Sequence, residues 1–191
     1  MARAGRRPGQ SGTRAQILGS ARTLFAEHGY HGTTVRAVAA DAGVNLALVH
    51  HYFGSKDQLF VAAMDIPINP AEIVEGLLAA GPHDEFPERL VRTFVRTWRD
   101  PDVGERLRAL LRSAAASADS GAAVRQLIEQ VVLPRVAIAL DISELRVAAM
   151  MSQLIGYAFA GMVIGAEPLA SATEDEMVAV LTPTIEAYLA G

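Results

Sequence analysis

Apolar residues recur along most of the chain at intervals of three and four, the period of amphipathic α-helices. No stretch shows the strict alternation of apolar and polar residues that marks a half-buried β-strand. Capping sequences predict helix starts at Lys56, after Ser55, and at Pro70, after Asn69. The spacing predicts further helices over residues 13–28, 34–42, 45–52, 87–99, 102–117, 120–140, 143–166 and 174–189. The pattern therefore predicts an all-α fold.

The composition agrees with a folded helical protein and excludes several classes of enzyme and metal site. Hydrophobic residues make up 51% of the 191 residues, enough to fill a sizeable core. The chain has no cysteine, which excludes disulfides, thiolate nucleophiles and cysteine-ligated zinc. The five histidines are not spaced as a metal site, and the sequence has no phosphate loop, zinc-protease motif or nucleophile elbow. We therefore expect neither an enzyme nor a protein with a metal or another cofactor.

Charge is divided unevenly along the chain. Residues 1–56 contain seven Lys and Arg against two Asp and Glu, a net charge of +5, while the remainder carries −9. A basic head on an acidic body is the polarity expected of a nucleic-acid-binding protein. Two other interpretations are open: a basic segment that only keeps the chain in solution, and a protein-interaction module whose head binds an acidic partner.

The centre of the basic head has the spacing of a helix-turn-helix. Gly43 stands between two short helices, where the turn needs a left-handed backbone that glycine adopts without strain. Ala39, four residues earlier, is small enough for two crossing helices to touch. The positions that would pack both helices onto the first are apolar: Val38, Ala42, Val44 and Val49. In this motif the second helix enters the major groove of DNA.

The segment from Thr13 to Phe60 resembles the tetracycline-repressor (TetR) family. The matching features are FAEHGY at the end of the first helix, Thr33-Thr34, the Ala-x-x-Ala-Gly-Val turn, and Tyr52-Phe53 followed by Ser-Lys-Asp-x-Leu. The rest of the chain matches only in length, helical content and acidity. The resemblance implies a cytoplasmic, homodimeric regulator of transcription, usually a repressor, that a small ligand in the C-terminal domain releases from double-stranded DNA.

Positions that match the family's motif mark the candidate DNA-binding residues. Phosphate contacts of the family fall on Thr33, Thr34, Arg36 and Lys56. Base, groove and backbone contacts fall on Asn45, Leu46, Ala47, His50 and Tyr52. The family usually has tyrosine where His50 stands, and a Ser-x-Gly or Ser-x-Pro-like stretch at residues 45–47. Asparagine can pair with adenine, whereas leucine and alanine could touch only a thymine methyl group.

The first twelve residues are predicted to form a flexible basic arm. Arg3, Arg6 and Arg7 lie among glycine and proline and are the basic residues of this arm. Such an arm either reaches into a minor groove or stays solvated.

The acidic part of the chain is expected to hold a ligand cavity and a dimer surface, as the resemblance implies. Candidate pocket residues, each of which could equally be ordinary core, are Phe94, Trp98, Leu107, Leu111, Met150, Met151 and Tyr157. Few bases interrupt these apolar stretches, which favours a flat or lipophilic effector. In the family the last two helices form a four-helix bundle between subunits. Small residues that would permit close approach there are Gly156, Ala160, Gly161 and Gly165.

Residues 147–166 contain no charge and are long enough to cross a bilayer. Ser152 and Gln153 lie inside this stretch, and it lacks flanking lysine and arginine clusters, which argues against a membrane span. We expect a helix buried in the core or between subunits. By contrast, Arg92, Arg96 and Arg99 recur at nearly helical spacing and are expected on a solvated face.

Taken together, the sequence predicts a DNA-binding regulator with two domains. A three-helix helix-turn-helix head occupies residues 1–60, and a helical ligand-binding and dimerisation bundle occupies residues 61–191. Its operator is expected to be a near-palindrome with half-sites about one helical turn apart. The alternative is the basic-headed interaction module without sequence-specific DNA binding.

Overall fold

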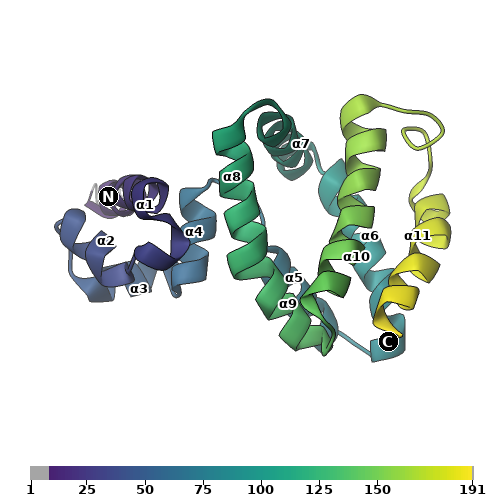
Figure 1. Cartoon of the computed structure of the whole chain (residues 1–191), viewed down its shortest axis with the longest axis horizontal. Helices are drawn as coiled ribbons and strands as arrows, with labels where there is room; N and C mark the ends of the chain where they lie inside the picture. The colour runs from purple at the N-terminus through teal and green to yellow at the C-terminus, as the bar shows by residue number, and fades with distance from the viewer. Residues whose placement is uncertain (1–8, 191) are drawn as a thin grey trace, which may run out of the picture. The chain divides into compact units, whose positions relative to one another are not determined.

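The structure, a computed structural model, describes residues 9–190, with side chains for residues 12–118 and 121–190. Every regular element in this part is helical (Figure 1), which confirms the predicted all-α fold. The basic residues Arg3, Arg6 and Arg7 of the predicted arm lie outside the described residues. The elements are α1 (Gly9–Gly32), α2 (Val35–Asp41), α3 (Leu46–Phe53), α4 (Lys56–Ala63), α5 (Pro70–Ala79), η1 (His83–Glu85), α6 (Phe86–Arg99), α7 (Pro101–Ala116), α8 (Ala118–Leu127), η2 (Ile128–Val132), α9 (Leu133–Leu140), α10 (Glu144–Tyr157), η3 (Ala158–Ile164) and α11 (Glu174–Leu189).

Local capping residues set most helix ends where the sequence predicts them. Ser55 and Gln58 form the capping box of α4, and Asn69 caps α5, whose first residue is proline. Thr173 and Glu176 form a second capping box at α11. The first helix differs from its prediction, because α1 begins at Gly9 rather than near residue 13.

The chain divides into two compact units, Met1–Asp65 and Ile66–Gly191. The division falls after residue 60, the predicted domain boundary, because α4 packs entirely within the first unit. The Nε of Arg22 on α1 donates to the carbonyl of Ala63 at the end of α4, at 2.9 Å. Leu59 and Phe60 of α4 are fully buried. The fourth helix is therefore part of the head.

An aromatic cluster holds α1 and α4 together. The ring centroids of Phe25 and Phe60 lie 4.7 Å apart in an edge-to-face arrangement, and Tyr30 lies 5.3 Å from Phe60. Phe25 is 2% exposed and Phe60 is fully buried. Such pairs add to the stability that burial of their apolar area already provides.

In the second unit, α6 packs on α11 and α7, and α8 continues through η2 into α9 as one helical rod (Figure 1). Proline at position 134 has no N–H to donate and crowds the preceding turn. Just before it the helix widens, because the N–H of Leu133 bonds the carbonyl of Ile128, five residues earlier. The helix predicted over residues 120–140 is thus interrupted by a π-helical turn before Pro134.

The sequence predicted that Arg92, Arg96 and Arg99 form a solvated face of α6, but all three contact α11 or the residues just before it. The Nη1 of Arg92 lies 2.9 Å from the carboxylate of Asp175, and Arg96 lies 2.9 Å from that of Glu174. Arg99 donates to the carbonyl of Ala172. These contacts join α6 to the start of α11. The spacing of the arginines along α6 could not predict them, because their partners are distant in the chain.

Candidate nucleic-acid interface and internal pocket

The helix-turn-helix has the geometry that its spacing predicts. Gly43 has a φ of +61°, the left-handed conformation expected of the turn. The N–H of Val44 donates to the carbonyl of Ala39 at 2.9 Å and closes the turn. Of the predicted inner residues, Val38, Ala42 and Val49 are at most 1% exposed and Val44 is half-buried. Ala39, the predicted point of close contact, is 3% exposed. The outer side of α3 is consequently left to solvent.

Most of the predicted DNA-binding residues lie at the surface of the head. Exposed side chains are Thr34, Arg36, Asn45, Leu46, Ala47 and His50, and those of Tyr52 and Lys56 are half-buried. Thr34 and Asn45 also cap helices: Thr34 Oγ1 accepts from the N–H of Ala37 at 3.0 Å, and Asn45 Oδ1 accepts from that of Ala47 at 2.9 Å. The amide oxygen of Asn45 is therefore already engaged before any base arrives.

Thr33 is the exception and requires a correction. Its side chain is only 1% exposed, and its hydroxyl lies 2.9 Å from the carbonyl oxygens of both Leu24 and Gly29. This hydroxyl ties the end of α1 to the start of α2 and cannot face a phosphate. Adjacent threonines look alike in the sequence, and only the packing separates the buried one from the exposed cap.

Lys56 is held in place at the first turn of α4. Its ammonium lies 4.3 Å from the centre of the Tyr30 ring, a cation–π contact, and the Tyr30 hydroxyl hydrogen-bonds the neighbouring Asp57. Partial burial lowers the pKa of the Lys56 ammonium below its ordinary value, while the Asp57 carboxylate opposes this shift. A cation at a helix start, where the helix dipole is positive, suits a phosphate.

Two exposed residues of α3 were not among those predicted from the sequence. Leu48 is 39% exposed, and His51 is also exposed, on the side of the helix turned away from the buried Val49 and Phe53. The helical period of α3 could have predicted their exposure, because positions 47, 48 and 51 are turned away from 49 and 53 on a helical wheel.

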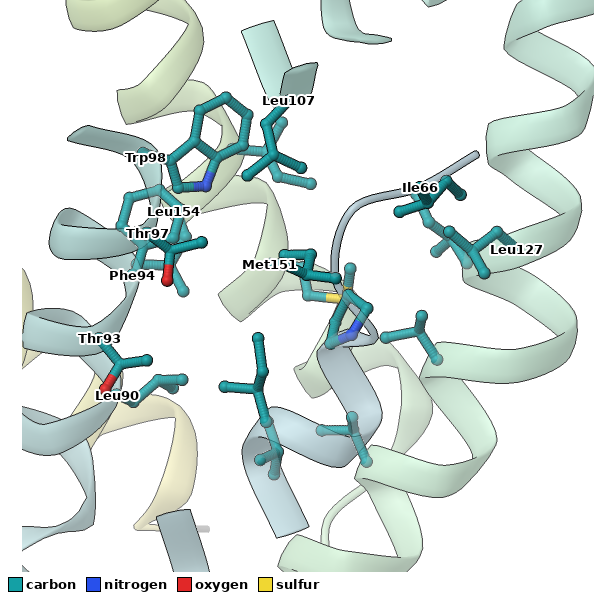
Figure 2. A pocket seen from close by; sticks show the side chains of 18 of the residues that line it. Ile66, Leu90, Thr93, Phe94, Thr97, Trp98, Leu107, Leu127, Met151 and Leu154 are labelled. Carbon is teal, nitrogen blue, oxygen red and sulfur yellow. The ribbon is translucent and has the colours of Figure 1, made fainter. Parts of the chain in front are cut away.

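The second unit contains a cavity of about 180 Å³ between α5, α6, α7, α10 and the α8–α9 rod. Figure 2 shows Phe94, Trp98 and Leu107 on one side of it, with Leu127 and Ile66 opposite. Six of the seven predicted pocket residues line it: Phe94, Trp98, Leu107, Leu111, Met150 and Met151. Main wall residues that the prediction omitted are Ile73, Leu90, Thr93, Thr97, Val136 and Leu154.

Tyr157, the seventh candidate, is not among the lining residues. Its hydroxyl donates to the carbonyl of Leu169 at 3.2 Å, and burial raises the pKa of this hydroxyl above its ordinary value. Tyr157 therefore holds the segment between η3 and α11 in place. The helical pattern of the sequence does not predict where that segment lies.

The cavity is chemically uniform. No Asp, Glu, Lys, Arg or His is among the residues described as lining it. Thr93 and Thr97, one turn apart on α6, and Trp98 are among the lining residues (Figure 2), but almost all of the cavity surface comes from apolar atoms. An ionised group placed here would lose its hydration without gaining a partner of opposite charge.

The helix Glu144–Ile164 is the candidate for a subunit contact. In the described part of the chain it is long and apolar enough to cross a membrane, and 33% of its most apolar window is buried inside the subunit. Leu145 is 79% exposed and Ile164 is 65% exposed, and Val180 of α11 is 68% exposed. A large apolar surface of this kind commonly marks a contact with another molecule.

The four small residues predicted at this contact differ in burial. Gly156 is exposed, with open space where a Cβ would stand, and Ala160 is half-buried. Gly165 ends the helix with a φ of +78°. Gly161 is buried, and a Cβ there would lie 3.1–3.2 Å from Leu169 of the same subunit. Its small size thus serves packing inside the subunit.

Comparison with known proteins decides the family. A family profile described as "Tetracyclin repressor-like, C-terminal domain" matches residues 84–189, more than half of the chain, and "Bacterial regulatory proteins, tetR family" matches residues 17–63. The chain belongs to the TetR family. The tetR-family match over residues 17–63 lies within the first unit and includes α2 and α3.

Individual relatives match either a part of the chain or the whole chain at low sequence identity. The chain is 43% identical to the HTH-type transcriptional repressor AcnR of Corynebacterium glutamicum over 72 residues, which are 37% of this chain and 37% of that protein. The match thus spans about a third of the repressor's length. A TetR-family regulator from Streptomyces coelicolor is 30% identical, with 98% of this chain and 100% of that one covered and a TM-score of 0.46. GusR of Salmonella enterica has a TM-score of 0.50 at 13% identity, covering 98% and 100% of the two chains, and shares the fold.

Proposed function

We propose that this TetR-family protein is a transcriptional repressor that binds its operator as a homodimer and leaves it when a small lipophilic effector binds. The exposed recognition helix in the basic head carries the first half of this proposal, and the uncharged cavity of the second unit supports the other half. The proposal assigns the protein no enzymatic activity and no cofactor. It places the protein in the cytoplasm, where its DNA is.

On DNA, the dimer would place one recognition helix in each of two successive major grooves. The operator is then a near-palindrome with half-sites about one helical turn apart. Thr34, Arg36 and Lys56 would bind phosphates and position the head, while the exposed residues of α3 would face the bases. An effector would release the protein by binding more tightly to a state whose heads do not fit the operator.

Fluorescence anisotropy with DNA from upstream of the protein's own gene tests the proposal, with scrambled DNA as control and a series of salt concentrations. We expect binding to the upstream DNA that is at least a hundredfold tighter than to scrambled DNA and that weakens steeply with salt. Equal affinity for DNA selected from a random library and for scrambled DNA would contradict it.

A charged side chain at Gly156 tests the dimer. Gly156→Glu should fit the isolated subunit, because nothing lies within 4 Å of the added Cβ. In a two-fold contact between α10 helices it would bring two carboxylates together without partners, and we expect the dimer to dissociate at least a hundredfold more readily in sedimentation experiments. Gly76→Glu on α5, where a Cβ also meets open space, is the matched control and should remain a dimer. A dimeric Gly156→Glu protein, or a monomeric wild type at micromolar concentration, would refute this arrangement.

Three ligands that differ only in charge test the effector chemistry. Adamantane-methanol, adamantane-carboxylate and adamantane-methylammonium share one compact apolar body. Since the cavity has no charged lining residue, we expect the alcohol to bind at least tenfold more tightly than either ion. Trp98 is the single tryptophan of the chain and lines the cavity, so its fluorescence reports binding directly. Tighter binding of the carboxylate or the ammonium would rule out a neutral effector.

A further inference from the structure

The first turn of the recognition helix exposes aliphatic side chains. Leu46 is 38% exposed and Leu48 39%, and the methyl group of Ala47 between them is also exposed. The next residue, Val49, is only 1% exposed and packs α3 onto the rest of the head. Packing inside the subunit therefore does not explain why leucine occupies both positions.

The polar side chains next to these leucines each have one atom engaged in the head. Asn45 Oδ1 accepts from the N–H of Ala47 at 2.9 Å as the helix cap. His50 Nδ1 lies 2.9 Å from the carbonyl oxygen of Gly54. Since a carbonyl oxygen only accepts, Nδ1 carries the proton, and the Nε2 of a neutral His50 is an acceptor. The acceptor half of a bidentate pair between Asn45 and adenine is thus occupied, and the leucine and alanine methyl groups stand beside its remaining amide donors.

The major groove offers one apolar feature, the 5-methyl group of thymine. The other base edges there are donors and acceptors, which lose hydration under a leucine side chain without gaining a partner. The head carries a net charge of +5 over residues 1–56, which complements the phosphates on either side of the groove. DNA is accordingly the occupant that suits both the charge of the head and the exposed aliphatic side chains in the first turn of α3.

We propose that Leu46 and Leu48 read thymine in each operator half-site by packing against its 5-methyl group. This inference rests on the proposed function and names how its recognition helix chooses sequence. Each half-site then contains at least one thymine whose methyl group, rather than its hydrogen-bonding edge, determines affinity. On a helical wheel Leu48 is turned away from the buried Val49 and Phe53, whereas Leu46 lies closer to them, so Leu48 makes the larger contribution.

Replacing thymine by uracil removes the methyl group and leaves base pairing unchanged, so it isolates this contact. Full-length protein would first select its site from random double-stranded DNA, and each thymine of that site would then be replaced in turn. At a contacted thymine we expect the affinity to fall about fourfold, the value of one buried methyl group, and about fifteenfold when both half-sites are changed.

A variant of the protein connects the effect to the side chain. Leu48→Ala should bind thymine and uracil versions of the site within about twofold of one another, because the methyl group has lost its partner. Ile138→Ala on α9, where the side chain is 82% exposed in the other unit, is the control and should keep the full difference. Circular dichroism would show that both variants are folded.

The outcomes separate this inference from the function on which it rests. A selected site whose affinity is unchanged by uracil at every thymine, or a Leu48→Ala protein that keeps the full difference, overturns the thymine contact alone. Selection that yields no common sequence overturns the proposed function, and the thymine contact with it.

Discussion

Replacing Arg36 and Lys56 together by alanine is expected to weaken operator binding about a thousandfold near 0.15 M salt. Each dimer would lose about four phosphate contacts, and each contact contributes about 0.9 to the slope of log affinity against log salt. The slope should therefore decrease by about 3.6. Affinity for scrambled DNA should fall in parallel, because phosphate contacts position the protein without reading sequence.

Anisotropy titrations at several salt concentrations measure both quantities. The control removes the same two charges from the acidic unit, with Arg106→Ala and Arg125→Ala, whose side chains are exposed on α7 and α8. This control should change operator affinity less than about twofold. An unchanged slope in the Arg36 and Lys56 double variant would show that the head binds its target without these phosphates, as the interaction-module alternative requires.

The Phe60→Ala variant is expected to lower the free energy of unfolding of the first unit by about 3–5 kcal/mol. Phe60 is fully buried, and its ring packs edge-to-face against Phe25 and Tyr30. The substitution leaves a cavity where α1 and α4 meet, and α1 is the support for α2 of the helix-turn-helix. Urea unfolding followed by far-UV circular dichroism measures the loss.

A second consequence of Phe60→Ala is expected in function. Operator binding should decrease as the head unfolds, while adamantane-methanol should still change Trp98 fluorescence, because the cavity is built within the second unit. The Ile138→Ala variant, at a strongly exposed position, should alter stability by less than about 0.5 kcal/mol. A loss below 1 kcal/mol for Phe60→Ala would mean that the aromatic cluster does not hold the head together.

Local features of the chain were predictable because their causes are local. Ser55 with Gln58, and Thr173 with Glu176, satisfy backbone donors of their own helix, so neighbours in sequence suffice to predict the start of α4 and α11. Gly43 similarly marks a turn whose left-handed conformation depends on the residue itself. The apolar period also identified Val38 and Val49 as inner residues of the helix-turn-helix.

The predictions that were wrong concern residues whose partners are distant in the chain or lie in a connecting segment. Tyr157 and Gly161 both contact Leu169, in the stretch between η3 and α11, and no helical period predicts where that stretch runs. Arg92 pairs with residues more than eighty positions away. Such contacts arise only once α6 and α11 have packed together.

For this protein the sequence by itself determined the helical class, most helix starts, the turn of the head and its family resemblance, because capping, turn conformation and amphipathic period act over a few residues. Only the tertiary structure decided that Thr33 is buried while Thr34 is exposed, that Leu48 faces outward, and that six scattered apolar residues line one uncharged cavity. Burial and cavities are properties of several helices at once, so they are determined when those helices pack.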